Sequence, residues 1–202
     1  MDIQWHGENC VSFKGKTGTL LVNPNESKAS ADIVLANSFS RDRGTVGNFG
    51  KDAKVFDLPG EYEAKNIFIQ GITAYDRPRE KDSAKKDEAE RIIIFAFEMD
   101  GFKICHLGNL GHKLTPEMLE AIGDVDILLV PVGGVGCLNA EKAHEVIEQI
   151  DPRVVIPVNY KDPSPFLKEV GVSSPQKERV WKIQSPANLP QEQTEFKILE
   201  VV

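Results

Sequence analysis

Two short polar segments of this 202-residue chain follow apolar stretches and carry side chains that could do chemistry. Hydroxyl, carboxylate and imidazole groups could together form a serine hydrolase site, in which a base activates the nucleophile and a carboxylate orients the base. That interpretation needs defined geometry and an oxyanion hole, and the sequence has no nucleophile-elbow motif, so the residue types alone do not establish it. The candidates are Ser38, Ser40, Asp42 and Arg43 in the first segment and His106 in the second.

The segment 102–136 predicts a strand, a loop, a helix and a second strand, which together would position His106. The first strand ends at His106, a glycine-punctuated loop follows, and Thr115 can cap the helix that starts at Pro116. The second strand, 126–132, is apolar on both faces, which is typical of a buried strand flanked by helices. Because α/β proteins commonly place sites at the carboxyl ends of such strands, His106 is a candidate site residue.

The rest of the chain predicts many short strands first, and strands alternating with helices later. That order favours two packed sheets with helices outside, and the length favours one domain spanning residues 1–202. The highly charged stretch 76–90 predicts a solvated or disordered hairpin loop. The further predicted strands are 3–5, 11–13, 19–22, 32–36, 54–56, 66–74, 91–98, 154–158, 180–183 and 194–201, and the further helices are 140–149 and 164–170.

Composition limits the partners and the location. A net charge of -7 argues against nucleic acid or an anionic membrane, since both favour basic patches. The three cysteines, Cys10, Cys105 and Cys137, form no CxxC pair, and their odd number favours free thiols in a reducing cytosol. The sequence shows neither a signal peptide nor an apolar segment long enough to cross a bilayer, so we expect a cytoplasmic protein. The sequence leaves open whether the chain forms a homo-oligomer.

Several segments resemble the metallo-β-lactamase-fold hydrolases, in particular their small lactonase-like branch. The segment HLGNLGHKLT resembles the HLGDLGH segment of that branch, and IQWHGENCVSF resembles its opening strand, which carries Gly-His-Ser/Ala. The segment LPGEYEAKNIFIQGI resembles the Pro-Gly-Glu-Tyr-Glu segment of the family, and DILLVPVGG and VVIPVNY resemble its later strands, in the expected order along the chain. The resemblance implies an α/β fold, the αββα four-layer sandwich, with two mixed β-sheets and helices on the outer faces.

Members of that family hold one or two zinc ions with a His-x-His-x-Asp-His loop, a later histidine, an aspartate and a final histidine. The resemblance places Asp42 at the aspartate of the loop and His106 at the later histidine, and both keep a ligand type. The other positions differ. Ser38, Ser40 and Arg43 stand at the three loop histidines, Asn109 at the later aspartate, Asn159 at the final histidine, and Glu8 at the histidine of the opening strand.

This pattern predicts that the chain binds no metal and has no cofactor. Serine hydroxyls and amide oxygens are poor zinc donors beside imidazole, and the guanidinium of Arg43 would repel a dication. Arg43 or Arg41 would instead pair with Asp42 or Glu8, because an unpaired buried carboxylate is costly. The eight substituted and retained positions would line a pocket for a small anionic ligand, with Arg43 as its anchor.

Three functional hypotheses follow. The first is a non-catalytic ligand-binding or scaffold relative of the zinc-dependent hydrolases. The second is an active metal-dependent hydrolase of lactone or phosphoester substrates, with a rearranged metal site and zinc as its cofactor. The third is a structural or oligomerisation role, in which the pocket is a relic and His106 is an ordinary hydrogen-bonded histidine.

Overall fold

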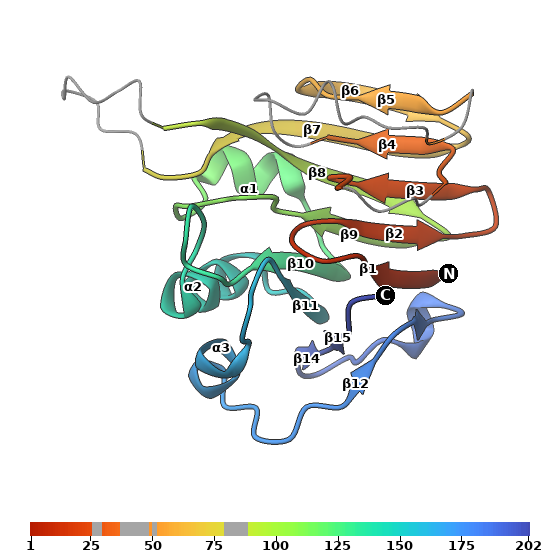
Figure 1. Cartoon of the computed structure of the whole chain (residues 1–202). Helices are drawn as coiled ribbons and strands as arrows, with labels where there is room; N and C mark the ends of the chain where they lie inside the picture. Colours follow the sequence, from red (N-terminus) through yellow and green to blue (C-terminus); the bar gives the residue numbers. More distant parts are fainter. Residues whose placement is uncertain (26–29, 37–48, 50–51, 79–88) are drawn as a thin grey trace.

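The structure, a computed structural model, describes residues 1–25, 30–36, 49, 52–78 and 89–202. Figure 1 shows two large sheets lying against each other, with the helices on the far side of the second sheet. A smaller sheet pairs β12 (Lys177–Glu178) with β15 (Ile198–Leu199). The α/β fold with two mixed sheets, expected from the resemblance, is confirmed.

The first sheet has six strands in the order β13-β1-β2-β3-β4-β5. Pairing is antiparallel from β13 to β3 and parallel from β3 to β5, so the sheet is mixed. The strands are β1 (Asp2–Trp5), β2 (Val11–Lys14), β3 (Thr19–Val22), β4 (Ile33–Leu35), β5 (Lys54–Phe56) and β13 (Trp181–Lys182).

The second sheet has seven strands in the order β14-β11-β10-β9-β8-β7-β6. The half from β6 to β9 is antiparallel, and the half from β9 to β14 is parallel. The parallel half matters for function, because the carboxyl ends of its strands meet at one edge. The strands are β6 (Gly60–Ala64), β7 (Ile67–Tyr75), β8 (Arg91–Met99), β9 (Phe102–His106), β10 (Ile127–Pro131), β11 (Val154–Val158) and β14 (Glu195–Phe196).

The main core lies between the two large sheets. Side chains that alternate along the strands meet there, and Phe13 of β2 contacts Phe97 of β8 edge to face, with ring centroids 5.2 Å apart. All residues of β10 and β11 are buried, as their continuous apolar sequence predicts for strands covered on both faces.

Three α-helices cover the outer face of the second sheet: α1 (Pro116–Ile122), α2 (Ala140–Ile150) and α3 (Ser164–Glu169). Their buried faces join the strand side chains of that sheet in a second apolar cluster. The predicted cap of α1 is present, since Thr115 Oγ1 accepts from the Met118 amide at 3.3 Å. Asn139 caps α2 in the same way, because its Oδ1 accepts from the Lys142 amide at 3.0 Å. A short 3₁₀ helix, η3 (Pro186–Asn188), follows β13. No helix in the described ranges is long and apolar enough to cross a membrane.

Several elements differ from the prediction. Strand β6 is not among the predicted strands, yet it pairs along its full length with β7 at the edge of the sheet. The predicted strand 194–201 is divided, because β14 pairs with β11 whereas β15 pairs with β12. At the ends of the charged stretch 76–90, the Asp76 amide donates to the Glu90 carbonyl at 3.1 Å. Residues 79–88 lie outside the described part of the chain, so the predicted hairpin loop stays a prediction.

Candidate functional site

His106 is the last residue of β9 and is completely buried. Its Nδ1 accepts a hydrogen bond from the Gly108 amide at 3.0 Å, in the tight turn where Gly108 has a φ of 60°. Its Nε2 lies 2.9 Å from the backbone carbonyl of Asn9, which can only accept, so Nε2 carries the proton. Both ring nitrogens therefore hold the loop after β9 against the loop after β1.

Burial lowers the pKa of His106 to about 4, and the hydrogen bond to the Asn9 carbonyl opposes this only in part. The imidazole is therefore neutral at pH 7. In this geometry the imidazole uses both its proton and its lone pair within the protein.

Three carboxamides form a hydrogen-bonded group beside His106, which we call the amide cluster: Asn9, Asn109 and Asn159. Asn109 Oδ1 accepts from Asn9 Nδ2 at 2.5 Å and from Asn159 Nδ2 at 3.0 Å. Both neighbours donate to the same Asn109 oxygen. If the side-chain amide of either Asn9 or Asn159 were turned by 180°, its hydrogen bond to Asn109 Oδ1 would be lost. The cluster thus joins the first sheet to the ends of β9 and β11.

Asn9 Oδ1 is an unusual atom in this cluster. The side chain is only 2% exposed, and this oxygen has no hydrogen-bond partner among the described residues. Buried polar atoms are nearly always paired, so such an oxygen requires an explanation. Asn9 is not among the site residues predicted from the sequence. Its position directly after Glu8, between two short apolar strands, was the only signal available.

The main chain of Glu8 connects the two sheets. Its carbonyl oxygen accepts hydrogen bonds from the backbone amide of Asn159 and from the indole Nε1 of Trp5, both at 2.8 Å. Glu8 and Asn159 both have positive φ values, 48° and 54°, which turn their backbones sharply at this contact. The side chain of Glu8 is exposed and takes no part in these bonds.

The structure brings together four of the eight predicted pocket residues. Asn109 and Asn159 are in direct contact, His106 reaches them through Asn9, and Glu8 adjoins Asn159 through its carbonyl. The other four, Ser38, Ser40, Asp42 and Arg43, lie outside the described residues, as does Arg41. The ion pairs predicted for Arg43 and Arg41 therefore stay predictions.

A cavity of about 650 Å³ lies next to the amide cluster, which we call the strand-end cavity. It is formed by the segments that follow β10 and β11 and by the start of α2, with Glu8 on its rim. Its lining includes Glu8, Gly133, Gly134, Asn139, Glu141, Asn159, Tyr160, Lys161, Asp162 and Glu169.

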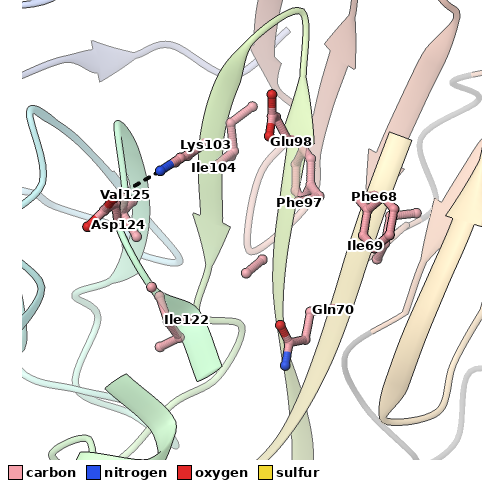
Figure 2. Close-up of a pocket in the computed structure, with 12 residues that line it drawn as sticks. Phe68, Ile69, Gln70, Phe97, Glu98, Lys103, Ile104, Ile122, Asp124 and Val125 are labelled. Atoms are coloured by element: carbon pink, nitrogen blue, oxygen red, sulfur yellow. Dashed lines mark hydrogen bonds and ion pairs between the residues drawn. The ribbon is translucent and has the colours of Figure 1, made fainter. Parts of the chain in front are cut away.

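A second, smaller hollow of about 250 Å³ lies between β7–β9 and the residues that follow α1 (Figure 2). The exposed ring of Phe68 lines it, and Lys103 Nζ lies 2.9 Å from Asp124 Oδ2 at its side. It shares no residue with the amide cluster or with the strand-end cavity.

The other histidines lie elsewhere. His112 Nε2 accepts from the Tyr75 amide at 3.2 Å and so orders its loop, and His144 is on the surface of α2 beside Glu169. His6 contacts Ser12 Oγ at 2.8 Å, and burial lowers its pKa. Within the described residues, none of these three joins His106 in a possible metal site.

The described residues alone do not fit a zinc ion. No group of three or more His, Cys, Asp or Glu side chains with suitable placement occurs within them. His106 would have to give up a hydrogen bond at one ring nitrogen before it could coordinate, and amide oxygens are weak zinc donors.

The sequence and the fold of this chain match those of known proteins. A family model described as a beta-lactamase superfamily domain matches residues 2–159. A UPF0173 metal-dependent hydrolase of Pyrococcus furiosus is 32% identical over 70% of this chain and 75% of its own length. A further UPF0173 protein of that organism is 26% identical over 90% of this chain and 93% of its own length. A solved structure from Thermotoga maritima, described as a Zn-dependent hydrolase of the metallo-beta-lactamase superfamily, is 27% identical with a TM-score of 0.75, and the match covers 98% of this chain and 99% of that chain.

These relatives correct one prediction. The absence of any cofactor, inferred from the substituted ligand positions, is wrong, because relatives are named metal-dependent or Zn-dependent hydrolases and so imply a metal cofactor. Substitution lowers affinity at the substituted positions, but it does not exclude other donors, since carboxylate and carbonyl oxygens also bind metal ions. The chain belongs to the beta-lactamase superfamily and is a relative of the UPF0173 metal-dependent hydrolases.

Proposed function

We propose that this chain is a metal-dependent hydrolase with a rearranged ion site, acting on a small lactone or phosphoester. The observation that carries the proposal is the strand-end cavity. It lies at the carboxyl edge of the parallel strands, where α/β proteins place their ligands, and it shares Asn159 with the amide cluster. The relatives named as metal-dependent hydrolases support the reaction class.

The described residues would bind and orient the substrate in this proposal. Asn159 lines the cavity and is held by Asn109 and by the Glu8 carbonyl, so its carboxamide is fixed before a ligand arrives. An ion would need donors beyond the described residues, and Asp42 is the predicted carboxylate among them.

The experiment combines metal analysis with turnover. The protein is purified from zinc-supplemented medium, its metal content is measured by mass spectrometry, and lactone and phosphodiester hydrolysis is assayed with chelator and with added zinc or manganese. We expect turnover that is lost with chelator and recovered with one ion. A protein that holds no ion and hydrolyses neither substrate class under any condition would contradict the proposal.

A second candidate is a ligand-binding protein without turnover. It is favoured by the amide cluster itself, because carboxamides stand where the resembled family has an aspartate and a histidine, and because both nitrogens of His106 are engaged. Saturable ligand binding in the cavity, together with no hydrolysis at full ion occupancy, would favour this candidate over the first.

A further inference from the structure

His106 and the amide cluster form one continuous hydrogen-bonded group. The Nε2–H of His106 donates to the Asn9 carbonyl at 2.9 Å, and the side chain of Asn109 accepts from those of Asn9 and Asn159. Asn9 lies between β1 and β2 of the first sheet, whereas the other three residues end or follow strands of the second sheet. We call this group the sheet clamp, because it joins the two large sheets.

Three members of the sheet clamp stand at positions where the resembled family has metal ligands. The resemblance places His106 at the later histidine, Asn109 at the aspartate and Asn159 at the final histidine. It therefore implies an ion between side chains that here bond to one another, either directly or through Asn9. The directions of these hydrogen bonds decide whether the three residues can hold that ion.

The lone pairs that an ion would need from His106 and Asn109 are already used. The Gly108 amide donates to His106 Nδ1 at 3.0 Å, and Nε2 carries the proton that is given to Asn9. A carbonyl oxygen has two lone pairs, and Asn109 Oδ1 accepts two amide hydrogens, from Asn9 and Asn159. Asn9 Oδ1 has no partner among the described residues, but a single neutral amide oxygen is a weak zinc donor.

Burial makes these hydrogen bonds costly to exchange for a metal ion. His106 is completely buried, and Asn9 is only 2% exposed. If the ring of His106 turned towards an ion, either the Gly108 amide or the Asn9 carbonyl would lose its partner. Polar groups without a partner in the interior destabilise a fold, so the sheet clamp opposes an ion at these positions.

We propose that the carboxamides of the sheet clamp replace a metal ion as the link between the two sheets, and that the ion of the hydrolase is bound without His106, Asn109 or Asn159. His106 is then a positioning residue, which fixes the loop after β9 through Gly108 and the loop after β1 through Asn9. The inference rests on the proposed function only in taking an ion to be bound at all. It leaves the metal implied by the relatives to other donors.

The first test follows the imidazole of His106 by NMR in the whole protein, labelled with ¹⁵N at histidine. After treatment with chelator, we expect a neutral ring that is protonated at Nε2 and whose Nε2 proton exchanges slowly with water. Adding zinc, with the bound metal measured by mass spectrometry, is expected to leave both ring nitrogen resonances in place. His106→Gln identifies these resonances by their loss. A zinc-induced shift of either nitrogen, or a slowly exchanging proton that appears only with zinc, would overturn the proposal.

The second test restores the residue types of the resembled family. A double variant, Asn109→Asp with Asn159→His, supplies a carboxylate and an imidazole beside His106, and histidine is among the residues that tolerate the φ of 54° at position 159. We expect it to bind about one zinc ion per chain more than the matched control and to show zinc-induced shifts of His106. The control, Asn109→Asp with Asn159→Gln, adds the same charge without the imidazole, and its His106 resonances are expected to stay in place.

Equal zinc content of the two double variants, with His106 unmoved in both, would show that the carboxamides do not stand in place of an ion, and would overturn the proposal. Its failure is separable from that of the proposed function. A protein that holds no zinc, hydrolyses nothing and keeps the His106 resonances in place retains this inference and loses the hydrolase. A zinc-dependent hydrolase in which zinc shifts the His106 resonances does the reverse.

Discussion

Asn159 donates its side-chain amide to Asn109 Oδ1 at 3.0 Å, and this bond joins the end of β11 to the loop after β9. The two residues are separated by 50 positions in sequence, yet they lie side by side because β9, β10 and β11 are neighbouring parallel strands. The bond fixes the wall of the strand-end cavity to the segment that contains His106.

Replacing the shared acceptor tests this arrangement. Asn109→Leu would leave the side-chain amides of Asn9 and Asn159 without their acceptor, and we expect it to lower the free energy of unfolding by about 2–3 kcal/mol. Asn109→Asp keeps an acceptor for both donors and serves as the matched control. Urea denaturation of both variants measures the difference. Equal stability of the Leu and Asp variants would contradict the shared-acceptor role.

The buried histidine predicts a pH dependence of stability. The pKa of His106 in the folded protein is about 4, below the unfolded value of 6.5, so the unfolded chain binds the proton more readily. The free energy of unfolding therefore keeps its full His106-linked value above pH 6.5. It falls by about 3 kcal/mol as the pH decreases from 6.5 towards 4.

The measurement is urea unfolding at several pH values for the wild type and for His106→Gln. The variant is expected to be less stable at pH 7 but to lose less stability between pH 6.5 and pH 4. Because burial also lowers the pKa of His6, His6→Gln is the matched comparison. A wild type and a His106→Gln variant with parallel pH profiles would refute the assignment of this dependence to His106.

Gly133 predicts a steric effect on the cavity. A Cβ atom at this position would lie 2.1 Å from the backbone oxygen of Asn159, and backbone cannot move away as a flexible side chain could. Gly133→Ala is therefore expected to displace the end of β11, to destabilise the protein by about 1–3 kcal/mol, and to weaken ligand binding in the cavity.

Gly136→Ala separates this steric effect from backbone strain. A Cβ at Gly136 meets no atom within 4 Å, although the φ of 65° disfavours alanine. The control is thus expected to lose some stability but to keep its ligand affinity. Thermal unfolding and titration with the lactone and phosphodiester substrates distinguish the two variants, and unchanged binding in Gly133→Ala would show that Asn159 had not moved.

Much of the fold could be predicted where local sequence and tertiary environment agree. The continuous apolar runs of β10 and β11 predict strands covered on both faces, and Thr115 and Asn139 predict the starts of α1 and α2. Strand β6 was missed because its Gly-Glu-Tyr-Glu-Ala sequence has little apolar character, as is usual for an edge strand, where exposed charges prevent further pairing.

The candidate site could be predicted only in part. Motif positions identified His106, Asn109 and Asn159, and the structure brings them together. Asn9 could not be found, because its importance arises from contacts with residues 97 and 100 positions away. The cofactor prediction failed for a related reason. The residue types at the family's ligand positions show only which donors are present at those positions, whereas a metal ion can bind any donor that the fold brings near.

The attachment of Glu8 through its main chain has a further consequence. Its carbonyl oxygen holds both Trp5 and Asn159, whereas its carboxylate holds neither. Any amino acid that tolerates this backbone conformation would supply the same carbonyl, so the sandwich places little demand on the identity of the side chain at position 8. Ligand preference at the cavity rim can thus be re-engineered there by single substitutions, with the architecture left intact.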